Sequence, residues 1–271
     1  MNTVTSKDGT TIAFDHVGAG PALILVDGAL CYRTFGPMGP LAALLAPHFT
    51  VYTYDRRGRG ESGDTPPFAV EREIEDIEAL INEARGSAGV YGISSGAFLA
   101  LEAASQLPAK ITKLAIYEPP ASMDEAAIQR FKEYRTQLDG LIAAGRRGDA
   151  VALFMRFVGG GLATDDNPMP DEPGAQMRGT PVWPMFEAVA PTLAYDAAAM
   201  GDSSVPTGVA AAVAMSTLAM AGGASPAWMQ RAAQAVAAAA PHAQSRILEG
   251  QTHEVAAEAI APVLIEFFSA R

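Results

Sequence analysis

The sequence predicts an α/β protein whose open, mostly parallel sheet is flanked by helices. Two observations favour this class: strand-like and helix-like runs alternate over residues 10–117, and several of the strand-like runs are apolar throughout. Strands that are apolar along their whole length are expected where helices cover both faces of a parallel sheet. Regular alternation implies right-handed crossovers between strands, with ligands bound at the carboxyl ends of the strands.

The first elements follow this alternation. Residues 10–16 alternate like a half-exposed strand, whereas residues 22–27 are apolar up to Asp27. The clearest helix covers residues 70–85, where isoleucine and leucine recur at helical spacing among acidic residues. In chain order, we expect strands over 10–16, 22–27, 50–55 and 88–92, and helices over 35–46 and 70–85.

The most informative motif is Gly92-Ile93-Ser94-Ser95-Gly96, which has the pattern G-x-S-x-G. It directly follows the strand expected over 88–92 and directly precedes a helix expected over 97–106. A serine at the apex of such a sharp turn holds its hydroxyl clear of the backbone, and small residues on either side let strand and helix approach closely. The pattern alone is common in Gly-rich chains, so it becomes informative only because a strand precedes it and a helix follows it. We therefore expect Ser94 to be a nucleophile.

The alternation ends after one further strand, expected over 111–117 and followed by Glu118. We interpret residues 121–202 as an inserted helical cap, because this stretch contains helical segments and no convincing buried strand. Residues 1–120 and 203–271 then form the core domain. Within the cap, we expect helices over 124–144 and 149–158 and a Pro-rich segment over 167–184.

The strand and helix pattern resumes after the cap. Residues 205–230 contain no charged side chain, and a run of that length can be a membrane span. This run is rich in alanine rather than leucine and is broken by proline and glycine, so we interpret it as a helix and a buried strand of the core. We expect strands over 216–221 and 245–248, and helices over 226–240 and 254–270.

Four histidines are available as a base, and His253 alone stands in the loop between a late strand and the final helix. Loops beyond strand ends are where catalytic groups gather. A serine hydroxyl is a poor nucleophile until a neutral imidazole takes its proton. We expect His253 to be this base, and His16, His48 and His242 to have structural roles.

With the serine turn, the strand order, the cap position and the late histidine in place, the chain resembles the α/β-hydrolase fold superfamily over essentially its whole length. The resemblance is to serine esterase or lactonase members. It implies an eight-stranded core with a helical cap after the sixth strand, and a triad in the chain order serine, acid, histidine. Ser94 and His253 match these motifs.

The triad acid is where the sequence departs from many members of that superfamily. Their acid follows the seventh strand, but residues 220–226 contain no carboxylate. Other members carry the acid directly after the sixth strand, and Glu118 occupies that place. We expect Glu118 to accept the second ring N–H of His253 and to stabilise its imidazolium form. The alternatives are a purely structural Glu118, Asp202 as the acid, or a triad without an acid.

The resemblance also implies an oxyanion hole of two backbone N–H groups. One donor is Ser95, which follows the nucleophile, and the other is Ala29, in the loop after the third strand. Asp27 stands where many members have histidine, and it either organises the loop or contacts the substrate. The candidates for the wall of a substrate pocket are Asp27, Leu30, Phe154 and Trp183. Packing of the cap onto the core explains the two aromatic residues equally well.

Composition narrows the choice of partners. The formal net charge of −11 and the lack of a basic cluster longer than Arg56–Arg59 argue against nucleic acid. That Arg-rich loop, together with Arg33, either reverses the local charge near the pocket or bonds to its own turn. The single cysteine, Cys31, is expected to be a small buried filler. No short-spaced cluster of histidine and acidic residues indicates a metal, and we expect neither a metal nor an organic cofactor.

These observations predict a serine hydrolase that cleaves a carboxylic ester or lactone of a small to medium apolar compound through an acyl-enzyme on Ser94. A serine at this position argues against epoxide hydrolases and haloalkane dehalogenases, which use a carboxylate there. The alternatives are a serine-triad C–C bond hydrolase, a cofactor-free lyase, or a receptor-like binding protein with little turnover. The start of the chain lacks the features of a secretory signal, so we expect a cytoplasmic protein, away from membranes and able to form a homodimer.

Overall fold

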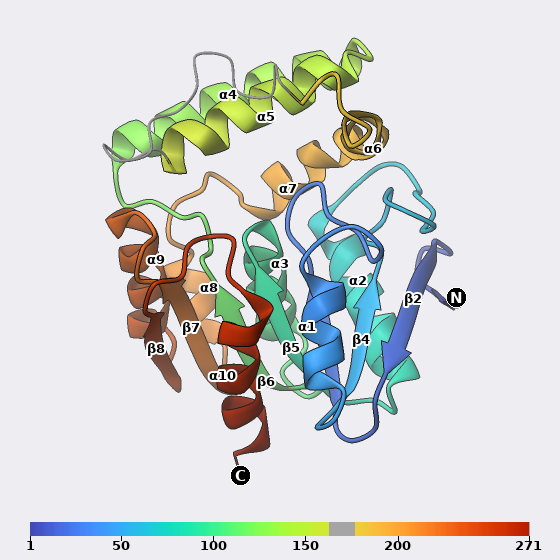
Figure 1. Cartoon of the computed structure of the whole chain (residues 1–271), viewed down its shortest axis with the longest axis vertical. Coiled ribbons are helices and arrows are strands. Elements are labelled where there is room, and N and C mark those ends of the chain that lie inside the picture. Colours follow the sequence, from blue (N-terminus) through green and yellow to red (C-terminus); the bar gives the residue numbers. More distant parts are fainter. Residues whose placement is uncertain (163–176, 271) are drawn as a thin grey trace.

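A computed structural model describes residues 1–162 and 177–270 of the chain (Figure 1). Within these residues, eight strands form one sheet in the order β1-β2-β4-β3-β5-β6-β7-β8. The pairs β1·β2 and β2·β4 are antiparallel and the other neighbours are parallel, which confirms the predicted fold class. The strands are β1 (Asn2–Thr5), β2 (Thr11–Val17), β3 (Ala22–Val26), β4 (Thr50–Tyr54), β5 (Ala88–Ile93), β6 (Ile111–Tyr117), β7 (Ser216–Gly222) and β8 (Ala243–Leu248).

Helices cover both faces of this sheet, as its fully buried central strands require. One face packs against α1 and α10, and the other packs against α2, α3, α8 and α9 (Figure 1). The charge-free residues 205–230 contribute α8, β7 and the start of α9 to this core. Within the described residues, every helix is too short or too polar to cross a membrane. The helix bounds are α1 (Met38–Leu45), α2 (Val70–Glu83), α3 (Ser95–Gln106), α8 (Thr207–Ala212), α9 (Ala227–Ala239) and α10 (Ala257–Ser269).

Two predicted helices start later than their apolar patterns suggest. The helix expected from residue 35 starts at Met38, because Tyr32 and Phe35 exchange two backbone hydrogen bonds of 2.9 and 2.7 Å in a tight turn before it. The helix expected from residue 254 starts at Ala257, after the side chain of Gln251 has accepted the N–H of Ala256 at 3.0 Å. In both places a local turn takes the backbone groups that a further helical turn would need.

Four helices form a separate layer over the carboxyl ends of the strands (Figure 1). This helical layer consists of α4 (Glu125–Ala143), α5 (Arg147–Leu162), α6 (Trp183–Val189) and α7 (Leu193–Ala199). Its own apolar cluster includes Phe131, Leu138 and Val151. The layer occupies the stretch that the sequence suggests is a cap, and much of the Pro-rich segment lies outside the described residues. The domain boundaries at 121 and 202 stay a prediction.

The strand order places the serine turn beside the loop after β3. The order in which the chain adds strands to the sheet reverses at β3, because β4 lies on one side of β3 and β5 lies on the other. Both neighbours are parallel to β3. Such a switch point leaves a crevice at the carboxyl ends of the strands, where ligands bind in open α/β sheets. Val26 pairs with Gly92, and Ile93 pairs with Tyr117, so the segments that follow β3, β5 and β6 emerge next to one another.

Candidate active site

Ser94 stands at a strained turn between β5 and α3. Its backbone has φ 57° and ψ −128°, a region that non-glycine residues rarely adopt. Side chains at the flanking positions 92 and 96 would collide with neighbouring backbone: a Cβ on Gly92 would meet the carbonyl oxygen of Gly96, and one on Gly96 would meet that of Asp27. The two glycines of the motif are therefore required by close packing of β5, α3 and the loop after β3.

Two neighbouring loops carry the same kind of strain. Leu30, after β3, has φ 61°, and Glu118, after β6, has φ 45°. Strained non-glycine residues persist only where surrounding contacts hold them, and they gather at functional sites. The three strained residues follow three adjacent strands, β3, β5 and β6, at one end of the sheet.

Glu118 and His253 are in direct contact, as the sequence predicts for an acid and a base. Glu118 Oε2 lies 2.8 Å from His253 Nδ1, and Glu118 Oε1 accepts the N–H of Gly222 at 2.7 Å. The Glu118 side chain is completely buried, with 0% exposure. Asp202, the alternative acid, is exposed and accepts the N–H of Ser204 at 3.0 Å. The carboxylate that meets His253 thus comes from the end of β6.

The loop that carries His253 is held by contacts with the ends of β6 and β7. The hydroxyl of Tyr117 donates to the carbonyl of Thr252 at 2.6 Å, and the N–H of Ala224 donates to the carbonyl of Gln251 at 2.9 Å. A Cβ on Gly222 would collide with that same carbonyl. These bonds fix the residues just before His253 to Tyr117, which precedes Glu118, and to the segment that follows β7.

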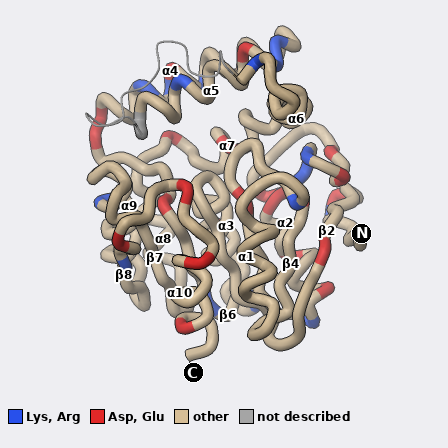
Figure 2. Tube along the Cα trace, viewed as in Figure 1, with Lys and Arg blue, Asp and Glu red and all other residues tan. Residues whose placement is uncertain are grey.

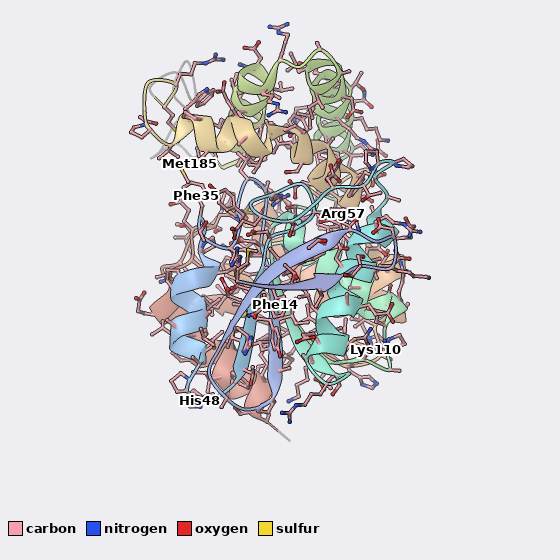
Figure 3. The ribbon with its side chains drawn as sticks, turned by 90° about the vertical axis from the view of Figure 1, so that its right-hand side faces the viewer. Phe14, Phe35, His48, Arg57, Lys110 and Met185 are labelled. Carbon is pink, nitrogen blue, oxygen red and sulfur yellow. The ribbon has the colours of Figure 1, made fainter. Side chains whose placement is uncertain are left out.

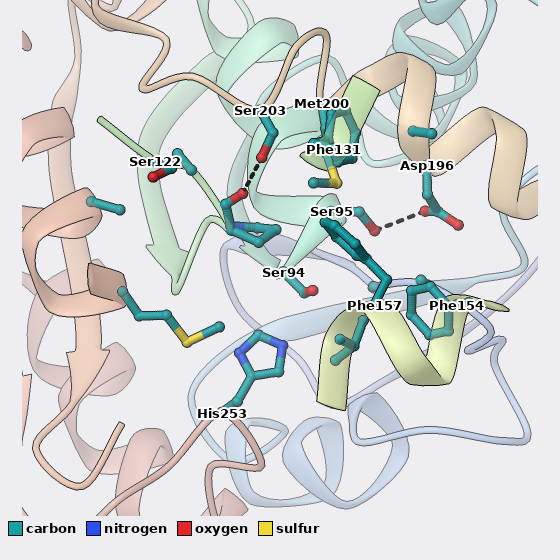
Figure 4. Close-up of a pocket in the computed structure, with 18 of the residues that line it drawn as sticks. Ser94, Ser95, Ser122, Phe131, Phe154, Phe157, Asp196, Met200, Ser203 and His253 are labelled. Atoms are coloured by element: carbon teal, nitrogen blue, oxygen red, sulfur yellow. Dashed lines mark hydrogen bonds between the residues drawn. The ribbon is translucent and has the colours of Figure 1, made fainter. Parts of the chain in front are cut away.

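Ser94 and His253 face one large pocket between the sheet and the helical layer. Their side chains point toward one another in Figure 4, and both line the pocket, which has a volume of about 1250 Å³. The other three histidines lie elsewhere: His16 stacks on Tyr52 with ring centroids 5.5 Å apart, and Figure 3 shows His48 at the end of the sheet far from the helical layer. His242 is exposed beside the start of β8.

The suggested pocket residues divide into two pairs. Asp27 and Phe154 line the pocket, but Leu30 and Trp183 are outside its wall. Leu30 is 4% exposed and Trp183 is 5% exposed, and both side chains are buried in the apolar cluster of the helical layer. The left-handed backbone of Leu30 explains why a side chain so near the nucleophile turns away from the pocket. Phe157 lines the pocket as well, and the sequence analysis missed Phe131 and Met200, which are also part of its wall.

The loop after β3 packs its backbone against the nucleophile. A Cβ on Gly28 would lie 3.1 Å from Ser94 Cβ and 3.6 Å from Ser94 Oγ. Ala29 and Ser95, the two residues expected to donate to an oxyanion, both line the pocket beside Ser94. Figure 3 shows Phe35, at the far end of this loop, below Met185 of α6, and the rings of Phe35 and Phe186 meet edge to face at 5.5 Å. The loop thus contacts both the nucleophile and the helical layer.

Asp27 is a buried carboxylate within this loop. Its Oδ1 accepts the N–H of Gly28 at 3.0 Å, and its side chain is also part of the pocket wall. Burial raises the pKa of Asp27 to about 7, although the Gly28 N–H and the charges of Arg59 and Arg56 act in the opposite direction. Burial, followed by the nearby charge of Asp27, also raises the pKa of the Cys31 thiol. Cys31 is therefore a thiol at neutral pH. Its side chain is only partly buried and lines the pocket, so the expectation of a buried filler is wrong.

Replacing Asp27 with asparagine should remove a pH dependence of stability. Because the folded pKa lies above that of an unfolded aspartate, Asp27 contributes stability at low pH that is lost as the pH rises through 7. The free energy of unfolding of the wild type should therefore fall by about 2 kcal/mol, relative to D27N, between mildly acidic and neutral pH. Urea denaturation of both proteins across this range measures the difference, and parallel pH profiles would contradict it.

The Arg-rich segment after β4 forms a buried network of ion pairs rather than a basic patch on the pocket. The side chains of Arg56, Arg57 and Arg59 are 0 to 1% exposed. Arg56 binds Glu73 of α2 through two bonds of 2.7 Å, and Arg57 binds Asp76 of the same helix through bonds of 2.8 and 2.7 Å. Figure 2 shows stretches coloured for Lys and Arg close to stretches coloured for Asp and Glu near α2.

The most connected acid of this network was missed by the sequence analysis. Asp196, on α7, binds both Arg56 and Arg59, and its Oδ1 also accepts the hydroxyl of Ser95 at 2.7 Å (Figure 4). The side chain is buried although nothing in its alanine-rich surroundings signals a role. Among the described residues, no cluster of three or more histidine, cysteine or acidic side chains is arranged to hold a metal ion.

The fold and this arrangement of serine, histidine and glutamate define a class of protein, and the chain belongs to the alpha/beta hydrolase family. The model of that family matches residues 16–263. Among solved structures, an alpha/beta hydrolase from Sphaerobacter thermophilus DSM 20745 is 52% identical to this chain, with a TM-score of 0.84. The match covers 99% of this chain and 100% of that one.

More distant relatives include esterases and a lactonase. A thermophilic esterase from Thermogutta terrifontis is 21% identical to this chain, with a TM-score of 0.71. The match covers 98% of this chain and 97% of the esterase chain. The enol-lactonase from Burkholderia xenovorans LB400 is 20% identical to this chain, with a TM-score of 0.66. The match covers 99% of this chain and 100% of the lactonase chain. At these identities the likeness is one of fold.

A curated relative matches only part of the chain. The pimeloyl-(acyl-carrier protein) methyl ester esterase of Xanthomonas campestris pv. campestris (strain B100) is 30% identical over 154 residues. These residues are 51% of this chain and 58% of that protein. The chain therefore matches little more than half of this relative's length.

Proposed function

We propose that the protein is a serine hydrolase that cleaves a carboxylic ester or a lactone through an acyl-enzyme on Ser94. The observation that carries this proposal is the 2.8 Å contact between the buried carboxylate of Glu118 and Nδ1 of His253, with Ser94 facing the same imidazole across the pocket. An acid, a base and a hydroxyl arranged in this way match the roles of a nucleophilic triad.

The chemistry assigns one role to each residue. Glu118 keeps the proton of His253 on Nδ1, so Nε2 is free to take the proton of Ser94. Ser94 Oγ then attacks the carbonyl carbon, and the amide N–H groups of Ala29 and Ser95 stabilise the resulting oxyanion. As this intermediate collapses, His253 returns the proton to the leaving oxygen. A water molecule, deprotonated by His253, then releases the acid from Ser94.

The pocket supports an apolar substrate. Phe131, Phe154, Phe157 and Met200 line its wall around Ser94, which leaves apolar surface for an acyl or alcohol group of small to medium size. The relative matched by sequence is named as a methyl ester esterase, and two proteins of the same fold are named as an esterase and an enol-lactonase. These names support an ester or lactone substrate. In a lactone, the leaving alcohol stays attached to the acyl chain after the ring opens.

Labelling with a fluorophosphonate tests this proposal directly. The phosphorus of such a probe accepts Ser94 Oγ and loses fluoride, which leaves a stable adduct on an activated serine. We expect one adduct per chain, located by mass spectrometry to the peptide that contains Ser94. Folded wild-type protein that stays unlabelled would contradict the proposal.

A panel of ester and lactone substrates separates the proposed reaction from C–C bond hydrolysis and from a lyase reaction. An ester or lactone hydrolase turns over at least some aryl esters or simple lactones, whereas a C–C bond hydrolase or a lyase leaves the whole panel intact. The lack of a carboxylate over residues 220–226, after β7, favours a receptor-like protein with little turnover. The contact of Glu118 with His253 supports a hydrolase instead.

A further inference from the structure

The carboxylate of Asp196 joins the helical layer to the nucleophile turn. It belongs to α7 and is buried, with 4% exposure. Its Oδ1 accepts Ser95 Oγ at 2.7 Å and Arg56 Nη1 at 2.6 Å, and its Oδ2 accepts Arg59 Nη2 at 2.7 Å. Burial raises the pKa of Asp196, but the charges of Arg59 and Arg56 outweigh it and hold the pKa below its usual value. The group is a carboxylate at neutral pH.

Arg59 continues this connection to the loop after β3. Its Nη1 donates to the carbonyl of Gly28 at 2.6 Å and to the carbonyl of Cys31 at 3.1 Å. Its Nε donates to the hydroxyl of Thr192, next to α7, at 3.0 Å. One guanidinium therefore holds both ends of the segment from Gly28 to Cys31 and is itself held by Asp196 and Thr192.

The bond to Gly28 sets the direction of the next amide group. The carbonyl of Gly28 and the N–H of Ala29 belong to one peptide unit, which is planar and trans, so the two groups point in opposite directions. Because Arg59 binds the carbonyl, the Ala29 N–H points away from Arg59. A rotated peptide would break the 2.6 Å bond and leave a buried carbonyl without its cationic partner, which costs free energy.

The same carboxylate also holds the residue that follows the nucleophile. Ser95 is the first residue of α3, so its amide N–H has no acceptor in a preceding helical turn and is free for a ligand. Its side chain is bound to Asp196. Asp196 thus restrains the Ser95 residue directly and the Ala29 peptide through Arg59.

We propose that Asp196 and Arg59 are positioning residues that hold the amide groups of Ala29 and Ser95 in the orientation required for an oxyanion hole, and that the hole therefore depends on the docking of α7. This inference rests on the proposed function. Asp196 also lines the pocket wall, and the inference is that it acts on the reaction through Ser95 and Arg59. The expected consequence is a loss of transition-state stabilisation, with substrate binding preserved.

Two substitutions test the inference through kcat and KM for an aryl ester such as p-nitrophenyl butyrate. Asp196→Asn keeps the shape of the side chain but places an NH2 group where a carboxylate oxygen accepts a bond from arginine. We expect kcat to fall by about 10- to 100-fold with little change in KM. This is somewhat less than the loss of one complete oxyanion donor, which lowers kcat about 100- to 1000-fold. Ser95→Ala leaves the backbone N–H in place, and we expect kcat to fall by about 3- to 10-fold.

Asp76→Asn is the matched control. Asp76 is a buried carboxylate that binds Arg57, the arginine next to Arg56 in the same segment, and neither residue of the pair contacts the loop after β3 among the bonds of the described structure. We expect D76N to lower the melting temperature while kcat stays close to the wild-type value. This variant separates the loss of a buried ion pair from the loss of oxyanion geometry.

The outcomes distinguish the two proposals. Wild-type protein that neither turns over esters nor reacts with a fluorophosphonate overturns the proposed function itself. If the wild type is active, the positioning inference is overturned when S95A and folded D196N keep the wild-type kcat, or when D76N lowers kcat as much as D196N does. If D196N does not fold, S95A decides alone, because in that variant Asp196 keeps both of its arginine partners.

Discussion

Replacing Ser94 with alanine should lower kcat/KM for an aryl ester by about 10⁴- to 10⁶-fold, the range typical of removing a nucleophile from a serine triad. Ser94 stands at the apex of the turn and faces His253 across the pocket, so the variant lacks the hydroxyl from which the imidazole would take a proton. The residual rate would come from the oxyanion donors and substrate binding alone. Steady-state kinetics with p-nitrophenyl esters measures the effect.

The same variant should fold like the wild type. Alanine has a Cβ just as serine does, so the strained backbone at position 94 is not made worse, and no hydrogen bond of the Ser94 hydroxyl holds the turn in the described structure. Ser105→Ala is a control on α3, the helix that follows Ser94: its hydroxyl donates to the carbonyl of Glu102, away from the pocket. An S94A protein with more than about one hundredth of the wild-type kcat/KM would exclude an acyl-enzyme on this residue.

Replacing Glu118 with glutamine should lower kcat by about 10³- to 10⁴-fold. Glutamine has the same shape, and its amide oxygen can still accept the Gly222 N–H that Glu118 Oε1 accepts at 2.7 Å. Its NH2 group would then face Nδ1 of His253, which favours the tautomer with the proton on Nε2. In that tautomer His253 has no lone pair directed at Ser94, so the base is lost while the fold is kept.

Asp202→Asn is the control for this second experiment, because Asp202 is the other carboxylate that the sequence allows as the acid. It is exposed and bound to the turn at Ser204, and its replacement should leave kcat within about twofold of the wild type. A variant set in which D202N loses activity and E118Q retains it would reverse the assignment. Circular dichroism of both variants confirms that the comparison is made between folded proteins.

Much of the fold follows from local patterns in the chain. The strands over 22–26, 50–54 and 111–117 agree with expectation to within a residue, because each is rich in β-branched, aromatic or other apolar residues and is bounded by turn residues. The strand β1 was not expected. Its side chains are mostly exposed, and it is held by backbone pairing with β2, which leaves no apolar signal in the sequence.

The pocket wall shows where sequence patterns stop being informative. Leu30 and Phe154 are both apolar residues of segments near the nucleophile, and only Phe154 lines the pocket. The difference is the direction of each side chain, which for Leu30 depends on a left-handed backbone angle of 61°. Such an angle depends on the contacts of the whole loop, including those made by Arg59.

The sequence by itself determined the serine turn, the alternation of strands and helices, and the identity of the late histidine. Each of these depends on residues that are contiguous in the chain, where spacing and side-chain volume act locally. For the triad acid, the sequence offered Glu118 and Asp202, and the tertiary structure decided between them: Glu118 meets His253 across 135 positions of the chain. The contact of Asp196 with Ser95, across 101 positions, was decided by the tertiary structure alone. It is a product of the docking of α7, and no local pattern encodes it.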